Sequence, residues 1–333
     1  MRKRALVLGC TGQLGSYLLE LLLEHDYECY GFVRRSSVGN VSRILHLYDK
    51  VKLINGDLTD TPSIEAALRI SKPHEVYNCA AQSQVGTSFI EPIHTADTTG
   101  MGALRLFEAV RTHTSLSEGV RVYQPSSSEM FGLSSAPQTE ETPFHPDSPY
   151  ACAKTFAHHA AQMYRRAYGL FIACGINFNF ESPRRGEEFV TRKITRALGR
   201  IQTGQQSVLR LGNLAARRDW SHAKDVAQAA WLMLQQSQPD NYVIASGVSH
   251  TVKEFVETAF NLAGLEWQKY VVVDPQHLRP LDVAHLEGCA NKAKAWLKWE
   301  PTVSFLDLVK EMVTHDLQLA DTESRVEPID GRK

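Results

Sequence analysis

The sequence predicts an α/β protein with a Rossmann-like, doubly wound parallel sheet and a smaller, mostly helical C-terminal lobe. A glycine-spaced turn at Gly9, Gly12 and Gly15 lies between a short apolar strand and a helix. Strand and helix patterns then alternate through the first half of the chain, which is typical of a parallel sheet. After Asn179 the periodicity weakens and returns mostly as helices. At 333 residues with 43% hydrophobic residues, the chain is long enough for two unequal lobes.

The expected elements follow in chain order. The run 4–8 is short and apolar, as in a strand buried on both faces, and the leucine spacing in 17–25 predicts the first helix. Further strands are expected at 27–33, 51–54, 75–78, 120–123, 171–178 and 242–245, and further helices at 98–112, 148–168, 189–202, 223–236, 251–263 and 305–319. The nucleotide-binding domain would comprise 1–178 with about 221–246, and the substrate lobe about 179–220 with 247–320. We expect the polar tail 321–333 to be disordered.

The glycine turn predicts a dinucleotide site. Strand, glycine turn and helix in this order form the context that the dinucleotide fingerprint requires. Glycine allows the tight turn and lets the backbone approach a pyrophosphate, whose negative charge faces the helix N-terminus. A simple loop turn is the alternative, and the flanking strand and helix favour the nucleotide.

The end of the second strand favours NADP over NAD. Asp or Glu there would accept from a ribose hydroxyl, whereas Arg accommodates a 2′-phosphate. This chain has Arg34 and Arg35 at that point, although a solvated basic loop is the alternative. Asp57, after the third strand, is a candidate for the adenine edge, and an Asx cap explains it equally well.

Charge and cysteine content narrow the function classes. The net charge of −1 gives no general attraction to nucleic acid or to membranes, and no stretch is long enough to span a bilayer. The six cysteines show no Cys-x-x-Cys spacing, so we expect reduced core thiols, a cytoplasmic protein and no metal site.

Tyr150 and Lys154 form a candidate acid/base pair. They are four residues apart in a predicted helix and therefore share a face. A tyrosine with its ordinary pKa near ~10 is a poor base at neutral pH, and a neighbouring ammonium favours the phenolate. Lys154 can also reach a nicotinamide ribose. A Tyr-x-x-x-Lys spacing occurs readily by chance, so the catalytic interpretation of this pair depends on other candidate residues in the sequence.

Ser127 and Glu129 are those other candidates. They follow the predicted strand 120–123, and being two apart in a near-extended segment they would point to one side. That place is the carboxyl end of a parallel strand, where such sheets hold their sites. A solvent-facing Glu129 is the alternative. A simple alcohol dehydrogenase needs no such carboxylate, whereas a sugar dehydratase does.

With these motifs in place, the chain resembles the extended short-chain dehydrogenases/reductases and, among them, the GDP-mannose 4,6-dehydratase family. The resemblance covers nearly the whole length. The matching segments are 9–17, 33–37, 77–83, 127–129, 148–154, 181–186, 189–193 and 218–220. Glu-Ser-Pro-Arg-Arg-Gly at 181–186 and Phe-Val-Thr-Arg-Lys at 189–193 are the most specific.

The resemblance implies a reaction. Tyr150 would take the proton from the C4 hydroxyl of the sugar as hydride leaves for NADP, and Ser127, where the family usually has Thr, would hydrogen-bond the C4 oxygen. Glu129 would remove the C5 proton and then assist loss of water from C6, to which the hydride returns. A GDP-manno-heptose 4,6-dehydratase, and another GDP-sugar epimerase or reductase, stay open as alternatives. A non-catalytic NADP-sensing protein is disfavoured by the intact Tyr150, Lys154 and Glu129.

The motifs and the resemblance together imply two sets of binding residues. For NADP these are Gly9, Thr11, Gly12, Gln13, Leu14, Gly15, Arg34, Arg35, Ser36, Asp57, Leu58, Ala80, Ala81, Gln82, Ser83, Tyr150, Lys154 and Arg185. For the GDP-sugar they are Ser83, Asn179, Val190, Lys193, Arg218, Arg279 and Asp282. Within the second set, Asn179, Arg218 and Arg279 would bind the diphosphate, Val190 and Lys193 the guanine, and Asp282 the nucleotide ribose.

Two further implications concern assembly and specificity. Arg35 and Ser36 match a loop that crosses to a neighbouring subunit in this family, which implies a homotetramer, with a dimer as the alternative. The chain departs from the usual family residues near the cofactor, at Leu14, Gln84, His94 and Phe180.

Overall fold

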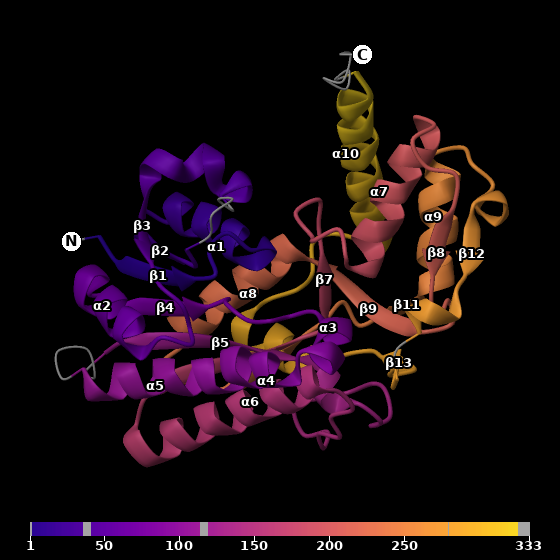
Figure 1. Ribbon diagram of the computed structural model, residues 1–333. Helices are drawn as coiled ribbons and strands as arrows, with labels where there is room; N and C mark the ends of the chain where they lie inside the picture. Colours follow the sequence, from indigo (N-terminus) through magenta and orange to yellow (C-terminus); the bar gives the residue numbers. More distant parts are fainter. Residues whose placement is uncertain (1, 36–40, 114–118, 279, 326–333) are drawn as a thin grey trace.

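A seven-stranded parallel sheet forms the centre of the computed structural model, which describes residues 2–35, 41–113, 119–278 and 280–325 (Figure 1). Its strands, in spatial order, are β10 (Asn241–Ile244), β6 (Phe171–Asn177), β5 (Arg121–Ser127), β4 (Glu75–Asn78), β1 (Arg4–Leu8), β2 (Glu28–Val33) and β3 (Val51–Asn55). The chain moves outward from β1 to β3 and then restarts at β4 on the other side. The predicted doubly wound sheet is therefore confirmed.

Helices cover both faces of this sheet because its strands are apolar on both sides. Ala5 and Val7 of β1 face one core, and Leu6 and Leu8 face the other. The first core is closed by α1 (Gln13–Glu24) and α8 (Ala223–Gln235), and the second by α2 (Thr61–Ser71), α5 (Gly102–Thr112) and α6 (Pro149–Tyr168). The short helices α3 (Val85–Ile90) and α4 (Pro92–Thr95) lie beside α6.

The second lobe has a separate hydrophobic core, drawn on the right of Figure 1. Its helices are α7 (Val190–Gln202), α9 (Val252–Leu262) and α10 (Phe305–Arg325). Two small sheets accompany them: β7 (Asn179–Glu181), β9 (Arg217–His222), β11 (Ser249–Thr251) and β13 (His285–Leu286) in one, β8 (Leu209–Leu211) and β12 (Val271–Val273) in the other. Sequence reasoning missed these strands because most have only two or three residues, and the six-residue β9 begins with three polar residues and shows no apolar run.

Some expectations need correction. Helix α10 continues to Arg325, so the first part of the tail expected to be disordered is helical, and 326–333 lie outside the described residues. Ala293 and Leu297 were assigned to the substrate lobe but pack into the core of α1 and α8. Cys152 is exposed rather than a core thiol, although all six cysteines are free. None of the described helices is long and apolar enough to cross a membrane.

Candidate active site

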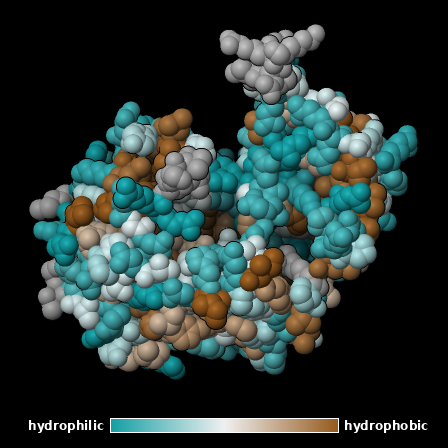
Figure 2. All heavy atoms as spheres, viewed as in Figure 1, coloured by the Kyte–Doolittle hydropathy of each residue, from teal (hydrophilic) through white to brown (hydrophobic). Residues whose placement is uncertain are grey.

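A deep cleft of about 1340 Å³ separates the carboxyl end of the large sheet from the second lobe. Figure 2 shows a hollow between the domain of the large sheet and the second lobe. It lies where the chain reverses direction between β1 and β4, the position at which doubly wound sheets bind ligands. Residues from both lobes line it, and most predicted site residues are among them.

The glycine turn lies at the floor of this cleft. Gly9 has a φ of +69°, and a Cβ there would lie 2.7 Å from the Ala80 nitrogen. A Cβ on Gly15 would lie 2.4 Å from the Gly9 oxygen, so any side chain would break the turn. Helix α1 begins after Gly12 without a side-chain cap, which leaves first-turn N–H groups for a ligand. The turn therefore fits the pyrophosphate of a dinucleotide, and Thr11, Gln13 and Leu14 line the cleft with it.

The Gln13 side chain has a contact that the sequence did not predict. Its Nε2 donates to the Phe180 carbonyl at 2.9 Å, and its Oε1 accepts from the Ser182 hydroxyl at 2.7 Å. The carboxamide thus fastens the nucleotide-binding turn to the start of the second lobe. Phe180, one of the departures from the family pattern, is held at the cleft wall by this bond.

Charged residues predicted to bind the cofactor follow strands β2 and β3. Arg34 and Arg35 are exposed and line the cleft beyond β2, while Ser36 lies outside the described residues. Asp57 accepts from the Thr59 N–H at 2.9 Å and from its hydroxyl at 2.8 Å. Burial alone would raise the pKa of Asp57, but these bonds and Arg34 hold it below its usual value. The Asx cap is therefore present, and Asp57 with Leu58 still lines the cleft.

Beyond β4, the loop carries Ala80, Ala81 and Ser83 into the cleft. Gln82 is not among the lining residues. Its Nε2 donates to Thr95 Oγ1 at 2.9 Å and to the Gln84 carbonyl at 3.1 Å. The prediction that Gln82 binds the cofactor is therefore not supported at its side chain, which braces the loop instead.

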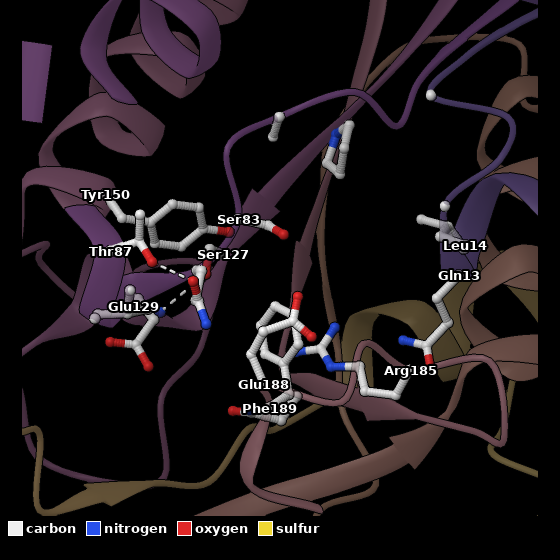
Figure 3. Close-up of a pocket in the computed structure, with 18 of the residues that line it drawn as sticks. Gln13, Leu14, Ser83, Thr87, Ser127, Glu129, Tyr150, Arg185, Glu188 and Phe189 are labelled. Carbon is white, nitrogen blue, oxygen red and sulfur yellow. Dashed lines mark hydrogen bonds between the residues drawn. The ribbon is translucent and has the colours of Figure 1, made fainter. Parts of the chain in front are cut away.

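Three of the four catalytic candidates, Ser127, Glu129 and Tyr150, lie together on one side of the cleft (Figure 3), and Lys154 lines the cleft with them. Helix α6 begins where the sequence predicts because Ser148 caps it, accepting from the Ala151 N–H at 3.1 Å, and Pro149 follows at the first helical position. This start places Tyr150 in the first turn and Lys154 one turn later, both buried. Strand β5 ends at Ser127 against the same helix.

The predicted extended segment through Glu129 is wrong. Strand β5 continues to Ser127, and a 3₁₀ turn, Ser128–Phe131, follows it. The Ser127 hydroxyl accepts from the Glu129 N–H at 3.2 Å and so caps this turn. Both side chains still line the cleft, because the turn rather than the pleat brings Glu129 beside Ser127 (Figure 3).

The protonation states differ from the sequence-based expectation. Burial raises the pKa of Tyr150 to about 12, a hydrogen bond with Ser127 opposes this, and the charge of Glu129 adds to it. Lys154 Nζ donates to the Pro125 carbonyl at 2.8 Å and lies 5.8 Å from the centre of the Tyr150 ring. Burial lowers the pKa of Lys154 to about 8. Lys154 is therefore anchored to β5, and burial rather than its ammonium dominates the pKa of Tyr150.

The second lobe supplies the opposite wall. Asn179, Val190, Lys193, Arg218 and Asp282 all line the cleft, as predicted, while Arg279 lies outside the described residues. Arg218 Nη2 lies 3.1 Å from Asp282 Oδ1, and Nη1 donates to the Val283 carbonyl at 2.7 Å. Burial lowers the pKa of Lys193.

Arg185 lies on the second-lobe side of the cleft. Its guanidinium lies 3.6 Å from the centre of the Phe189 ring and pairs with Glu181 at 3.2 Å. Glu188, Phe189 and Thr87 also line the cleft but were not predicted as site residues (Figure 3). The available signals were that Phe189 begins the motif 189–193 and that Glu188 directly precedes it. Of the departures from the family pattern, Leu14, Gln84 and Phe180 line the cleft, whereas His94 does not.

Solved structures of sugar-nucleotide enzymes share this fold. The dTDP-glucose 4,6-dehydratase of Bacillus anthracis, in complex with NAD, aligns with a TM-score of 0.83 at 23% identity over 96% of this chain and 98% of that one. The UDP-glucose 4-epimerase of Thermus thermophilus, in complex with NAD, aligns with a TM-score of 0.82 at 26% identity over 95% and 99%. Together with the Tyr150–Lys154 helix, the fold and cleft define an extended short-chain dehydrogenase/reductase.

Sequence comparison gives the family. The profile described as GDP-mannose 4,6 dehydratase matches residues 6–312. GDP-mannose 4,6 dehydratase 1 of Arabidopsis thaliana is 54% identical over 331 residues, covering 97% of this chain and 92% of that protein. The human GDP-mannose 4,6 dehydratase is 46% identical over 347 residues, covering 96% and 93%. The chain belongs to the GDP-mannose 4,6-dehydratase family, and the heptose, epimerase and reductase alternatives are not favoured.

Proposed function

We propose that this protein is an NADP-dependent hydro-lyase that converts GDP-mannose to its 4-keto-6-deoxy derivative. The observation that carries this proposal is the meeting of Tyr150, Ser127 and Glu129 at one end of a cleft whose floor is the glycine turn. Oxidation requires a tyrosine that accepts the hydroxyl proton during hydride transfer, and elimination requires a second acid/base. The family to which the chain belongs supports GDP-mannose as the substrate.

The first step is the oxidation of the sugar at C4. NADP, when bound, would accept a hydride from C4 of the sugar and later return it to C6. Tyr150 and Ser127 hold the C4 oxygen, and Tyr150 takes the hydroxyl proton. Tyr150 can take this proton only as the phenolate, so its own proton must first leave, and burial, which raises the pKa of Tyr150 to about 12, opposes that loss.

Glu129 carries out the elimination. A ketone at C4 acidifies the C5 proton, which the Glu129 carboxylate removes. The protonated carboxyl group then donates to the departing C6 hydroxyl, so one side chain acts first as base and then as acid. Water leaves with the former C5 proton. When the hydride returns to C6, the proton taken from the C4 hydroxyl by Tyr150 is available to C5, so atoms balance and the cofactor ends in the state in which it began.

The NADP preference rests on the basic end of β2. Arg34 and Arg35 line the cleft at that point, and no acidic residue stands there to accept from a ribose hydroxyl. On the substrate side, Lys193, Arg218 and Asn179 offer donors for a nucleoside diphosphate, in keeping with the GDP of the proposed substrate.

The proposed reaction is redox-neutral, which gives its test. Incubation with GDP-mannose and a catalytic amount of NADP is expected to yield a product lighter by one water, without net NADPH. Mass spectrometry follows the product and absorbance follows the cofactor. NAD is expected to support slower turnover. Stoichiometric accumulation of NADPH would instead indicate a simple dehydrogenase.

We also propose a homotetramer in which the Arg35 loop reaches a neighbouring subunit's cofactor. Arg35→Glu is then expected to weaken assembly and to lower NADP affinity about 10- to 100-fold, the value of a charge-assisted hydrogen bond. Light scattering and cofactor titration measure the two effects. The matched variant Arg34→Glu is expected to weaken NADP binding while the oligomer persists. Assembly unchanged by Arg35→Glu would remove the interface role.

A further inference from the structure

Three successive residues at the end of β5, Pro125, Ser126 and Ser127, face α6. Lys154 Nζ donates to the Pro125 carbonyl at 2.8 Å, and the Ser127 side chain lies beside the Tyr150 side chain in the cleft (Figure 3). Between them, the Ser126 hydroxyl lies 2.7 Å from Nδ1 of His158. Tyr150, Lys154 and His158 are spaced by four along the helix and share its buried face. The contact between Ser126 and His158 takes no direct part in the proposed reaction.

His158 is held in one orientation. Its Nε2 lies 3.0 Å from Nε2 of Gln162, which can only donate, so Nε2 of the imidazole accepts. Nδ1 then carries the proton and donates to Ser126 Oγ. The ring packs edge-on to Phe144, with 5.2 Å between the ring centres, and the side chain is 1% exposed. Burial lowers the pKa of His158 to about 3, so the imidazole stays neutral near pH 7.

We infer that His158 is a positioning residue, which fixes the end of β5 against α6 through Ser126 and thereby sets the distance between the Tyr150 hydroxyl and Ser127. Ser126 itself lines the cleft, and its backbone joins Pro125 to Ser127. A shift of Ser126 would therefore move both neighbouring contacts. This inference rests on the proposed function, because it assigns the importance of that distance to proton transfer at the sugar.

The test compares variants of the full-length protein at the same GDP-mannose and NADP concentrations. His158→Leu removes the donor at similar volume and is expected to lower kcat about 10- to 100-fold, the cost typical of a misplaced reacting group. KM for GDP-mannose is expected to stay nearly unchanged, since the GDP-binding wall lies in the other lobe. His158→Asn, whose Nδ2 occupies the place of Nδ1, is expected to restore most of the rate.

Three further variants keep the inference falsifiable. Ser126→Ala is a smaller change and is expected to lower kcat similarly, and combining it with His158→Leu should add little, because both remove one interaction. His159→Leu changes the adjacent, exposed histidine and serves as the control. Thermal midpoints are measured for all five variants and for the parent protein.

The outcomes separate the two proposals. A parent protein that does not dehydrate GDP-mannose would contradict the proposed function. An active parent with kcat unchanged in His158→Leu, or lowered equally in His158→Asn, would overturn the positioning role. A lowered thermal midpoint at unchanged kcat would assign His158 to stability alone.

Discussion

Replacing Glu129 by glutamine is expected to nearly stop water loss while sugar oxidation continues. The amide cannot accept the C5 proton, and losing a positioned acid/base typically costs ~100- to 10,000-fold in rate. The bond that places residue 129 is made by its backbone N–H to Ser127, so the variant keeps the 3₁₀ turn. Tyr150, Ser127 and Lys154 remain to support oxidation at C4.

A single turnover measures this separation. NADPH absorbance that forms and persists, or a 4-keto sugar that retains its water, is the expected result. Glu188→Gln is the matched control, because it neutralises another carboxylate that lines the cleft. It is expected to change the rate of water loss far less. A Glu129→Gln protein that still eliminated water at near the parent rate would require another acid/base and end the mechanism proposed above.

Replacing Tyr150 by phenylalanine is expected to abolish both half-reactions. The change removes only the hydroxyl that takes the C4 proton, so oxidation should fall by a comparable ~100- to 10,000-fold. Since elimination needs the C4 ketone, water loss disappears with it. Neither NADPH in a single turnover nor product in a steady-state assay should form at an appreciable rate.

A second tyrosine of α6 provides the comparison. The Tyr164 hydroxyl donates to Glu108 at 2.8 Å, away from the cleft. Tyr164→Phe is expected to lower the free energy of unfolding by ~1 kcal/mol, as for one hydrogen bond, at unchanged kcat. If Tyr150→Phe still oxidised the sugar in a single turnover, the proton would have another acceptor and Tyr150 would only hold the substrate.

The sequence predicted the large sheet well and the second lobe incompletely. Strand β1 is buried on both faces and appears in the sequence as an apolar run that ends at the glycine turn. Strands β7 and β8 have only three residues each, and β9 begins with the polar residues Arg217, Arg218 and Asp219. Their pairing partners lie far along the chain, so no local pattern indicates them.

The candidate site shows the same division. Tyr150 and Lys154 were predicted because helical spacing of four places two side chains on one face. The 3₁₀ turn at Glu129 was not predicted. A Ser127 side chain that caps a turn stabilises it against an extended backbone, and which conformation forms depends on the residues packed around it. Nor did the sequence indicate that Gln13 would bridge to Phe180 and Ser182, whose positions follow from the meeting of the lobes.

What the sequence alone determined is the set of chemical groups and their order: the glycine turn, the arginines after β2, the carboxylate after β5 and the Tyr/Lys helix. Each depends on local geometry that a few neighbouring residues impose. The tertiary structure decided what those groups contact. Lys154 is anchored by the Pro125 carbonyl and Ser126 by His158, across sequence separations of 29 and 32 residues. Such bonds form only once β5 and α6 have packed, because packing excludes water and leaves each buried polar group dependent on the partner beside it.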